Sequence, residues 1–379
     1  MTEQRPHPAE ERVRVVLVGA GNMGRAWFTT LMQSDDVDLV GLVDLNTELA
    51  HRLVADEGTP SIVVGTSLAD VGKETAGNAV VNVTVPAAHY PVSVEALFAG
   101  LPVLCEKPIA PTLAEGLALA AASEAAGQLL MTSQSRRYFR VLAEFRAHIS
   151  RLVPVGILTT EFYKAPHFGG FRETMEQPLL IDMAIHAFDA ARYLLDSEPL
   201  AVTCESFNPS WSWYAGDAAA VATFEFEHGA RYVYQGSWCS PGQETNWNGR
   251  WRASGARGTA TWDGESSPHS EGEQGGHIGS DPQYPDAEEI AGSLAEFVAA
   301  LRTGQRPSGE VHGNIRSLAM VEAAVLSAQT HTRISIDAHL ETSYRLALTQ
   351  PWDERVSSQL SSWGSAREGL DCHKGQTGA

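Results

Sequence analysis

The chain has 379 residues, of which 43% are hydrophobic and 19% charged, and its formal net charge is −19. This length allows two domains with cores of their own. The acidic balance disfavours nucleic acids and anionic membranes as partners, because both would be repelled. No apolar stretch reaches the roughly eighteen residues that span a bilayer, and residues 1–8 lack the apolar core of an export signal.

The four cysteines stand at positions 105, 204, 239 and 372. Their spacing is neither that of a metal site nor that of a disulfide framework, so we expect a reduced cytoplasmic protein that binds no metal.

Strands and helices alternate over the first 133 residues. We expect strands at 13–18, 37–43, 79–85, 103–105 and 129–132, and helices at 25–33, 47–56, 89–99 and 112–126. Strands that alternate with helices through short connections predict a doubly wound parallel sheet with helices on both faces. Residues 1–133 are therefore predicted to form a dinucleotide-binding Rossmann domain.

The pattern changes after about residue 150. We expect strands at 155–164, 201–207, 218–227, 230–239, 249–254 and 259–262, and helices at 179–195, 287–302 and 313–330. The turn at 228–229 predicts a hairpin that pairs the aromatic residues Phe224, Phe226, Tyr232 and Tyr234. Residues 134–340 are predicted to form an α+β domain with a large open, mostly antiparallel sheet. We interpret 265–285 as a mobile loop and assign no role to the tail at 341–379.

A glycine-rich turn joins the first predicted strand to the first helix. Gly19, Gly21 and Gly24 form G-x-G-x-x-G, which allows a tight turn, close approach of a pyrophosphate and close packing of helix on strand. The phosphates would lie at the positive end of the helix. Asp44 ends the second strand, where a carboxylate accepts hydrogen bonds from ribose hydroxyls and repels a 2′-phosphate. The motif predicts a site that prefers NAD to NADP.

Two further segments of the first domain are candidates for the site. Thr84 and Pro86 end a strand beside the expected nicotinamide path, and His89 either caps the next helix or is merely exposed. Lys107 follows the carboxyl end of another strand, where it faces the ligand crevice, and Pro108 restricts its backbone.

The second domain carries a candidate acid/base group on a predicted helix. Asp182 and His186 are four residues apart and share one helical face, which Asp189 extends. Hydride transfer between an alcohol and a nicotinamide needs a group that takes or gives the hydroxyl proton. Histidine titrates near neutrality and suits this role, and a lysine whose pKa is lowered by nearby cations also serves.

In these residues the chain resembles the glucose–fructose oxidoreductase, inositol dehydrogenase and rhizopine-catabolism (Gfo/Idh/MocA) family. The matching segments follow the family's order over about residues 12–340: Gly19-Ala-Gly-Asn-Met-Gly24, Asp44, Thr84-Val-Pro86 with His89, Glu106-Lys107-Pro108, Gln134-Ser-Arg-Arg137 and Asp182-x-x-x-His186-x-x-Asp189. The resemblance implies a Rossmann domain and an α/β domain whose open sheet pairs subunits into a homodimer or homotetramer. It implies NAD-dependent hydride transfer on a hydroxyl-bearing carbon of a sugar, cyclitol or related polyol.

The resemblance also implies roles for individual residues. Lys107, Asp182 and His186 match the catalytic trio, with His186 as acid/base, Lys107 polarising the reacting oxygen and Asp182 orienting the pair and binding hydroxyls. The implied cofactor contacts are Gly19, Gly21, Asn22, Met23, Gly24, Asp44, Thr84, Pro86, His89, Glu106 and Lys107. The expected substrate contacts are Lys107, Arg136, Tyr163, His167, Asp182 and His186, with Lys164 nearby.

Several features leave the substrate open. The second domain is rich in tryptophan, and we expect one of these rings to stack on a sugar while the others pack the sheet or an interface: Trp211, Trp213, Trp238, Trp247 and Trp251. Gln177-Pro178 and Ala184 stand where many family members have glycine, so the local backbone must differ. Two alternatives are transient use of NAD, in epimerisation or glycoside cleavage, and a non-catalytic NAD-binding sensor.

Overall fold

The computed structural model describes residues 11–272 and 282–371, which form two compact units. Among the described residues, the first unit takes 11–135, 286–315 and 341–371. The second unit takes 136–272, 282–285 and 316–340. The units thus interleave along the chain, whereas the domains predicted from the sequence follow one another.

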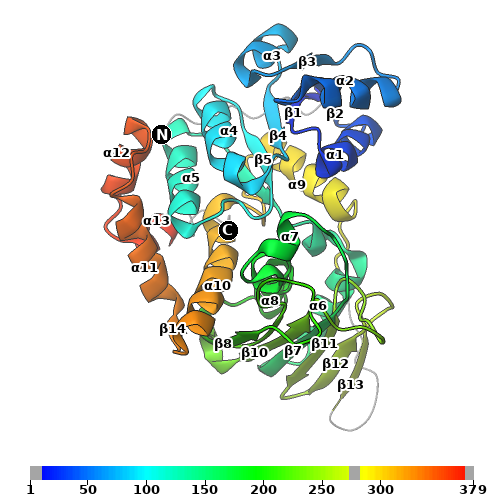
Figure 1. The fold of residues 1–379 in the computed structure, drawn as a ribbon, viewed down its shortest axis with the longest axis vertical. Coiled ribbons are helices and arrows are strands. Elements are labelled where there is room, and N and C mark those ends of the chain that lie inside the picture. The colour runs from blue at the N-terminus through cyan, green and yellow to red at the C-terminus, as the bar shows by residue number, and fades with distance from the viewer. Residues whose placement is uncertain (1–10, 273–281, 372–379) are drawn as a thin grey trace. The chain divides into compact units, whose positions relative to one another are not determined.

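A parallel sheet of six strands, in the order β3-β2-β1-β4-β5-β6, organises the first unit (Figure 1). Its strands are β1 Val13–Val18, β2 Val37–Val43, β3 Val63–Gly65, β4 Ala79–Asn82, β5 Val103–Glu106 and β6 Leu130–Ser133. The connecting helices are α1 Asn22–Gln33, α2 Thr47–Asp56, α3 Leu68–Thr75, α4 Pro86–Phe98 and α5 Leu113–Ala126. The predicted Rossmann sheet is confirmed, and the sequence pattern missed only β3 and α3 within it.

Local sequence explains these elements well. The strand β1 reads VRVVLV and is buried along nearly its whole length, as expected of a strand covered by helices on both faces. The helix α5 begins where the Thr112 side chain accepts a hydrogen bond from the Glu115 N–H, and it ends at Gly127, whose φ of 62° is left-handed. The strand order reverses between β1 and β4, and ligands bind at such switch points.

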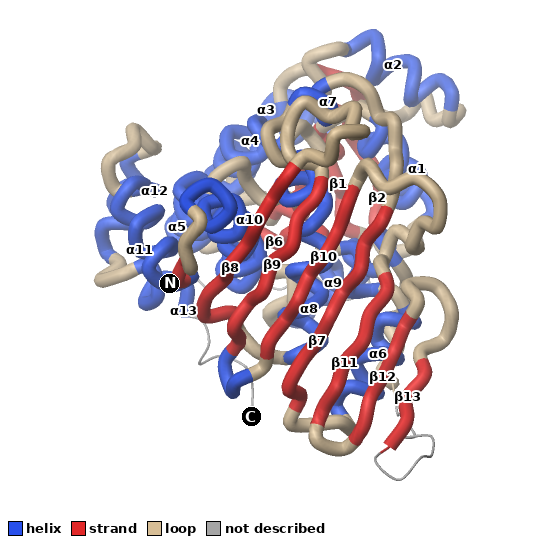
Figure 2. Tube along the Cα trace, turned by 60° about the horizontal axis from the view of Figure 1, so that its bottom comes forward, coloured by secondary structure: helices blue, strands red, loops and turns tan. Residues whose placement is uncertain are grey.

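The second unit is built on an eight-stranded sheet in the order β13-β12-β11-β7-β10-β9-β8-β14, seen face-on in Figure 2. Its strands are β7 Val155–Tyr163, β8 Pro199–Phe207, β9 Ala219–Phe226, β10 Arg231–Ser237, β11 Arg250–Gly255, β12 Gly258–Trp262, β13 His269–Gly272 and β14 Ile334–Ser335. Only the pair of β7 and β10 is parallel among these neighbours, which confirms the mostly antiparallel sheet.

One strand lies where the sequence suggested a mobile loop. The segment β13 pairs with β12, so the loop interpretation is wrong for residues 269–272. Its polar side chains gave no strand pattern in the sequence, because backbone hydrogen bonds to β12 determine this strand. Residues 273–281 of the same interpretation lie outside the described residues.

Aromatic residues build the core of the second unit. Tyr232 pairs with Phe224 across the β9–β10 hairpin, and both side chains are buried, as are Phe226 and Tyr234. Phe188 packs edge-on against three of these rings, with centroids 4.7–6.3 Å apart. It comes from α8 (Ile185–Leu195), which covers this face of the sheet together with α6 (Arg140–Ser150), as Figure 2 shows. The predicted aromatic pairing across the hairpin is confirmed for Phe224 and Tyr232, whereas Tyr234 pairs with Ala222.

The remaining helices and turns lie before, between and after the strands of the eight-stranded sheet. They are α9 Glu289–Thr303, α10 Val311–Thr330, α11 Ile336–Ala347, α12 Glu354–Ser362 and α13 Ala366–Asp371, with the short α7 Phe171–Thr174, the 3₁₀ turns η1 Ser135–Tyr138 and η3 Glu227–Gly229, and the π-helical turn η2 Leu179–Ala184. Within the described ranges, no helix is long and apolar enough to cross a membrane.

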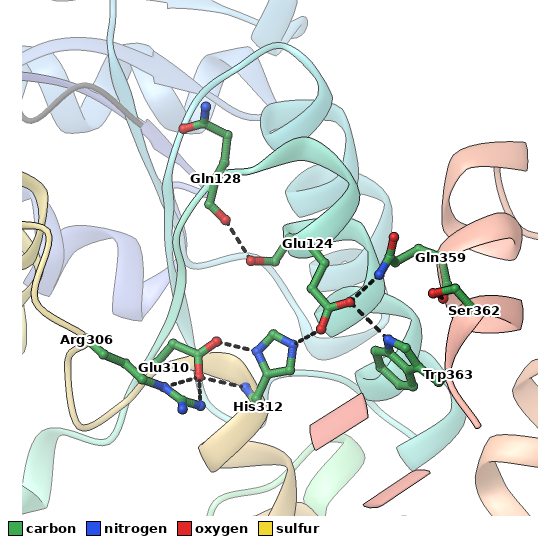
Figure 3. Close-up of polar contacts among 9 residues, drawn as sticks. Glu124, Gln128, Arg306, Glu310, His312, Gln359, Ser362 and Trp363 are labelled. Atoms are coloured by element: carbon green, nitrogen blue, oxygen red, sulfur yellow. Dashed lines mark hydrogen bonds and ion pairs between the residues drawn. The ribbon is translucent and has the colours of Figure 1, made fainter. Parts of the chain in front are cut away.

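The tail packs against α5 through a cluster of buried polar groups (Figure 3). Glu124 accepts hydrogen bonds from the Gln359 amide at 2.5 Å and from the Trp363 indole N–H at 2.9 Å. On the other side, His312 lies between Glu124 and Glu310, with nitrogen–oxygen distances of 2.8 and 2.5 Å. The tail is therefore an integral part of the first unit.

Candidate active site

The glycine turn contains two structurally required glycines and one open one. Gly19 has a φ of +111°, and a Cβ there would lie 2.9 Å from the Val83 carbonyl oxygen. A Cβ on Gly24 would lie 2.2 Å from the Gly19 carbonyl oxygen, so α1 packs on the turn too closely for any side chain. A Cβ on Gly21, in contrast, would meet no atom within 4 Å. The open approach at Gly21 is what a pyrophosphate next to the backbone needs.

The start of α1 is suited to an anion. The helix begins at Asn22 directly after the turn, no side chain caps it, and its first turn has no acidic residue. Its first N–H groups and the positive end of its dipole are therefore left for a ligand. Asn22 and Met23, the two other predicted contacts in the loop, are exposed at this end.

Asp44 is hydrogen-bonded to the backbone of the glycine turn and to the backbone just after itself. Its Oδ2 accepts from the Ala20 N–H and its Oδ1 from the Asn46 N–H, each at 2.7 Å. Each carboxylate oxygen has further lone pairs, which can accept ribose hydroxyls. Together with the glycine turn, this placement fits the adenosine half of a dinucleotide.

The segment after β4 is tied together by Asn82. The Thr84 hydroxyl donates to the side-chain Oδ1 of Asn82 at 2.7 Å, and the side-chain Nδ2 of Asn82 donates to the Ser93 hydroxyl at 3.1 Å. Pro86 is the first residue of α4, where its missing N–H costs nothing. His89 is only 1% exposed, so of its two predicted alternatives it is neither exposed nor a cap.

The Glu106-Lys107-Pro108 segment follows β5 as expected. Glu106 is the buried last residue of the strand, and burial raises the pKa of its carboxyl group despite the Trp27 N–H and Lys107 beside it. Lys107 is half-buried, and its peptide bond to Pro108 is cis.

In the second unit, Asp182 lies in the π-helical turn η2 and His186 in the first turn of α8. The helix predicted over 179–195 is confirmed, and its first part, 179–184, is π-helical and continues directly into α8. A π turn often marks a functional site. Both residues are half-buried, which leaves part of each side chain accessible.

Arg172, which the sequence did not single out, pairs with Asp182. Its Nε donates to Asp182 Oδ2 at 2.6 Å, and its guanidinium lies 5.2 and 4.9 Å from the ring centres of Phe168 and Phe171. Only the folding of α7 brings these residues together, so no local pattern could have found the pair.

Asp189 has a structural role in this fold. It is buried and receives two hydrogen bonds of 2.7 Å from Arg137 and one of 2.6 Å from Ser317. Burial would raise the pKa of Asp189, but Arg137 and Arg192 more than offset it, and the pKa lies below its usual value. Arg137, from the predicted match at Gln134–Arg137, therefore forms a buried ion pair with Asp189 of α8, the helix that also carries His186.

The predicted substrate residues occupy different surroundings in the second unit. Burial lowers the pKa of Arg136 to about 10, and its guanidinium is 4.0 Å from the Met183 sulfur, one residue from Asp182. Tyr163 ends β7, with burial raising its pKa, and Lys164 pairs with Glu244 at 2.8 Å. Arg136 lies near the π-helical turn that carries Asp182, whereas Tyr163 and Lys164 lie at the carboxyl end of strand β7.

The tryptophans separate into two groups. Trp238 and Trp251 are buried and pack the sheet. Trp211 and Trp247 are 65% and 42% exposed, and Trp213 stacks on His167 with ring centres 3.8 Å apart. The exposed rings keep a surface for the apolar face of a ligand.

Two family models match the chain. Residues 13–134 match the model of an oxidoreductase family with an NAD-binding Rossmann fold (GFO_IDH_MocA), and residues 151–261 match the GFO/IDH/MocA C-terminal domain. Both compact units thus carry a part of the same family's architecture.

Individual proteins agree with this assignment. An inositol 2-dehydrogenase of Saccharopolyspora erythraea is 32% identical over 52% of the chain and 57% of its own length. A D-apiose dehydrogenase of Paraburkholderia graminis is 26% identical over 84% of the chain and 88% of its own length. An oxidoreductase from Agrobacterium radiobacter, solved with NAD⁺, L-tartaric acid and magnesium, shares the fold with a TM-score of 0.78 at 18% identity, over 86% of this chain and 99% of that one.

The Rossmann sheet, the fitted glycine turn and the two matched domains lead to one conclusion. The chain belongs to the GFO/IDH/MocA family of NAD-binding oxidoreductases.

Proposed function

We propose that the protein is an NAD-dependent dehydrogenase acting on a hydroxyl-bearing carbon of a sugar, cyclitol or related polyol. The observation that carries the substrate class is the Arg172–Asp182 pair beside His186, with aromatic rings next to the guanidinium. A carboxylate and a guanidinium together accept from and donate to neighbouring hydroxyls. Relatives named inositol 2-dehydrogenase and D-apiose dehydrogenase act on this class of compound.

Each residue of the catalytic trio has its own part in the proposal. NAD, when bound, accepts or returns the hydride. His186 takes or gives the hydroxyl proton, Lys107 polarises the reacting oxygen, and Asp182 binds hydroxyls and orients the other two groups. Lys107 belongs to the first unit and Asp182 and His186 to the second, so their joint action is part of the proposal.

For the cofactor, we propose that the glycine turn holds the pyrophosphate and that Asp44 selects NAD over NADP. The carboxylate is bonded in place by Ala20 and Asn46 and would repel a 2′-phosphate. Leu45, which follows it, is 92% exposed and offers no positive charge in compensation.

We also propose that the protein forms a homodimer or homotetramer through the open face of the eight-stranded sheet. This face exposes apolar side chains, with Val221 43% and Ile157 41% accessible, next to a groove of about 460 Å³ that includes Glu161, Arg250 and Arg252. Light scattering tests this: Val221→Glu should yield monomers where the wild type is oligomeric. The buried thiols of Cys105, Cys204 and Cys239 suit a reducing cytoplasm, which we propose as its location.

A panel of polyols with NAD tests the activity. Accumulation of NADH with at least one sugar or cyclitol supports the proposal, and the double variant Lys107→Ala, His186→Ala should abolish it. Conversion of substrate without net NADH would instead support transient oxidation, as in epimerisation or glycoside cleavage. Tight NADH binding with no conversion of any compound would support a sensor. Unchanged turnover in the double variant would overturn the assigned roles.

A further inference from the structure

Lys107 is flanked in the chain by two groups that buried side chains hold in place. On its amino-terminal side is Glu106, whose Oε1 accepts from the Trp27 indole N–H at 2.8 Å. The other oxygen of Glu106 accepts from the backbone N–H of Lys107 itself, at 3.1 Å. Trp27 belongs to α1 and is fully buried. The carboxylate thus connects the helix that opens at the glycine turn to the backbone of the lysine.

On the carboxyl-terminal side, His89 holds Pro108. The Nδ1 of His89 lies 2.8 Å from the carbonyl oxygen of Pro108, and its Nε2 lies 3.0 Å from the carbonyl oxygen of Thr84. His89 comes from α4 and is 1% exposed, so the ring has almost no surface left for a ligand. It connects the segment after β4 to the segment after β5.

We propose that Trp27 and His89 are positioning residues for Lys107. Both hold backbone next to the lysine, and neither presents its own side chain to solvent. A lysine side chain is long and flexible, so the place of its amine depends on a fixed backbone origin, and a displacement of about 1 Å at a reacting group can cost roughly a hundredfold in rate. This inference rests on the proposed function, because that function gives Lys107 its role.

The hydrogen bonds of Glu106 and His89 depend on donors that single substitutions remove. Glu106 is buried, and its two oxygens are matched by two N–H donors. Removing the Trp27 N–H leaves a buried carboxylate oxygen without that donor, which favours rearrangement of the segment. A neutral imidazole carries a single N–H, so removing the His89 ring takes that donor from one of two part-buried carbonyls, that of Pro108 or that of Thr84. Each change therefore loosens the backbone on one side of Lys107.

Chemical labelling of the lysine amine tests the proposal without any substrate. The chain has only four lysines, at positions 73, 107, 164 and 374. Trace acetylation followed by peptide mass spectrometry therefore compares the extent of acetylation of Lys107 with that of the exposed Lys73. Trp27→Phe keeps an aromatic ring and removes the indole N–H, and His89→Ala removes the imidazole ring that contacts the Pro108 and Thr84 carbonyls. We expect the Lys107 to Lys73 labelling ratio to rise by about threefold or more in both.

A matched control removes the same kind of bond elsewhere in the first unit. Trp363→Phe deletes an indole N–H donated to the Glu124 carboxylate at 2.9 Å, and it should leave the labelling ratio unchanged. His89→Gln retains a side-chain donor of similar reach and should restore most of the wild-type ratio. An unchanged ratio in Trp27→Phe and His89→Ala, or an equal rise in Trp363→Phe, would overturn the proposal.

Kinetics with a polyol from the panel give the second readout. A positioning role predicts that kcat falls about tenfold to a hundredfold in Trp27→Phe and His89→Ala, while the dissociation constant of NADH changes less than about twofold. Weakened NADH binding with unchanged kcat would overturn the proposal and make these residues cofactor supports. If no polyol is oxidised, the proposed function fails, whereas the labelling ratios still decide whether Lys107 is positioned in this way.

Discussion

Replacing His312 with glutamine should remove a pH-dependent part of the stability. The imidazole lies between Glu124 and Glu310, and all three side chains are at most 10% exposed (Figure 3). Burial alone would lower the pKa of His312, but hydrogen bonds and charge from the two carboxylates raise it to about 9. Glu310 also pairs with Arg306, and its pKa is lowered to about 2 against the opposing effect of burial.

The raised pKa of His312 sets both the sign and the size of the effect. A histidine whose pKa is higher in the folded than in the unfolded chain stabilises the fold fully below about pH 6.5, and this contribution is lost as the pH rises through about 9. For these two values the contribution is about 2–3 kcal/mol at pH 7 and close to zero at pH 10. Because His312 and Glu310 share one interaction, their contributions are not added.

Urea unfolding followed by circular dichroism at pH 7 and pH 10 measures this. The difference in unfolding free energy between the wild type and His312→Gln should shrink by about 2–3 kcal/mol from pH 7 to pH 10, since groups common to both proteins cancel. The exposed His51→Gln on α2 serves as control and should show no such change. A difference that stays constant across this range would refute the charged histidine between the carboxylates.

Four further substitutions have contrasting expected effects. Gly24→Ala should lower the melting temperature, measured by calorimetry, by several degrees, because its Cβ would lie 2.2 Å from a backbone oxygen. Gly21→Ala should leave the melting temperature unchanged and weaken NADH binding, measured by fluorescence titration, about tenfold. Asp189→Asn should destabilise the protein by about 3–5 kcal/mol in chemical unfolding, since it leaves the Arg137 guanidinium without its anionic partner. Asp44→Asn should reduce the ratio of NADH to NADPH affinity about tenfold in a titration, and an unchanged ratio would contradict the role of the carboxylate.

The parts of the fold that the sequence predicted are those determined by near neighbours. The glycine turn and the capped ends of α5 depend on residues a few positions apart, and a single sequence contains that information. The tail was not predicted, because its helices are held by contacts such as that of Gln359 with Glu124, 235 positions away. The Arg172–Asp182 pair was missed for a related reason, since it depends on how α7 folds. The helix over 179–195 was predicted without its π-helical turn, because α- and π-helices both place residues four apart on nearly the same face.

The two halves of the proposed chemistry are supported in different ways. The lysine backbone is held by buried groups, Trp27 with Glu106 on one side and His89 on the other. Asp182 pairs with Arg172, whose side chain is 36% exposed, and an ion pair of this exposure contributes at most about 1 kcal/mol. Exchanging that pair for substrate hydroxyls therefore costs little, whereas moving the lysine disturbs a buried network. We infer that substrate preference resides at Arg172: its replacement should change the relative rates among polyols, while Trp27→Phe should slow all of them in proportion.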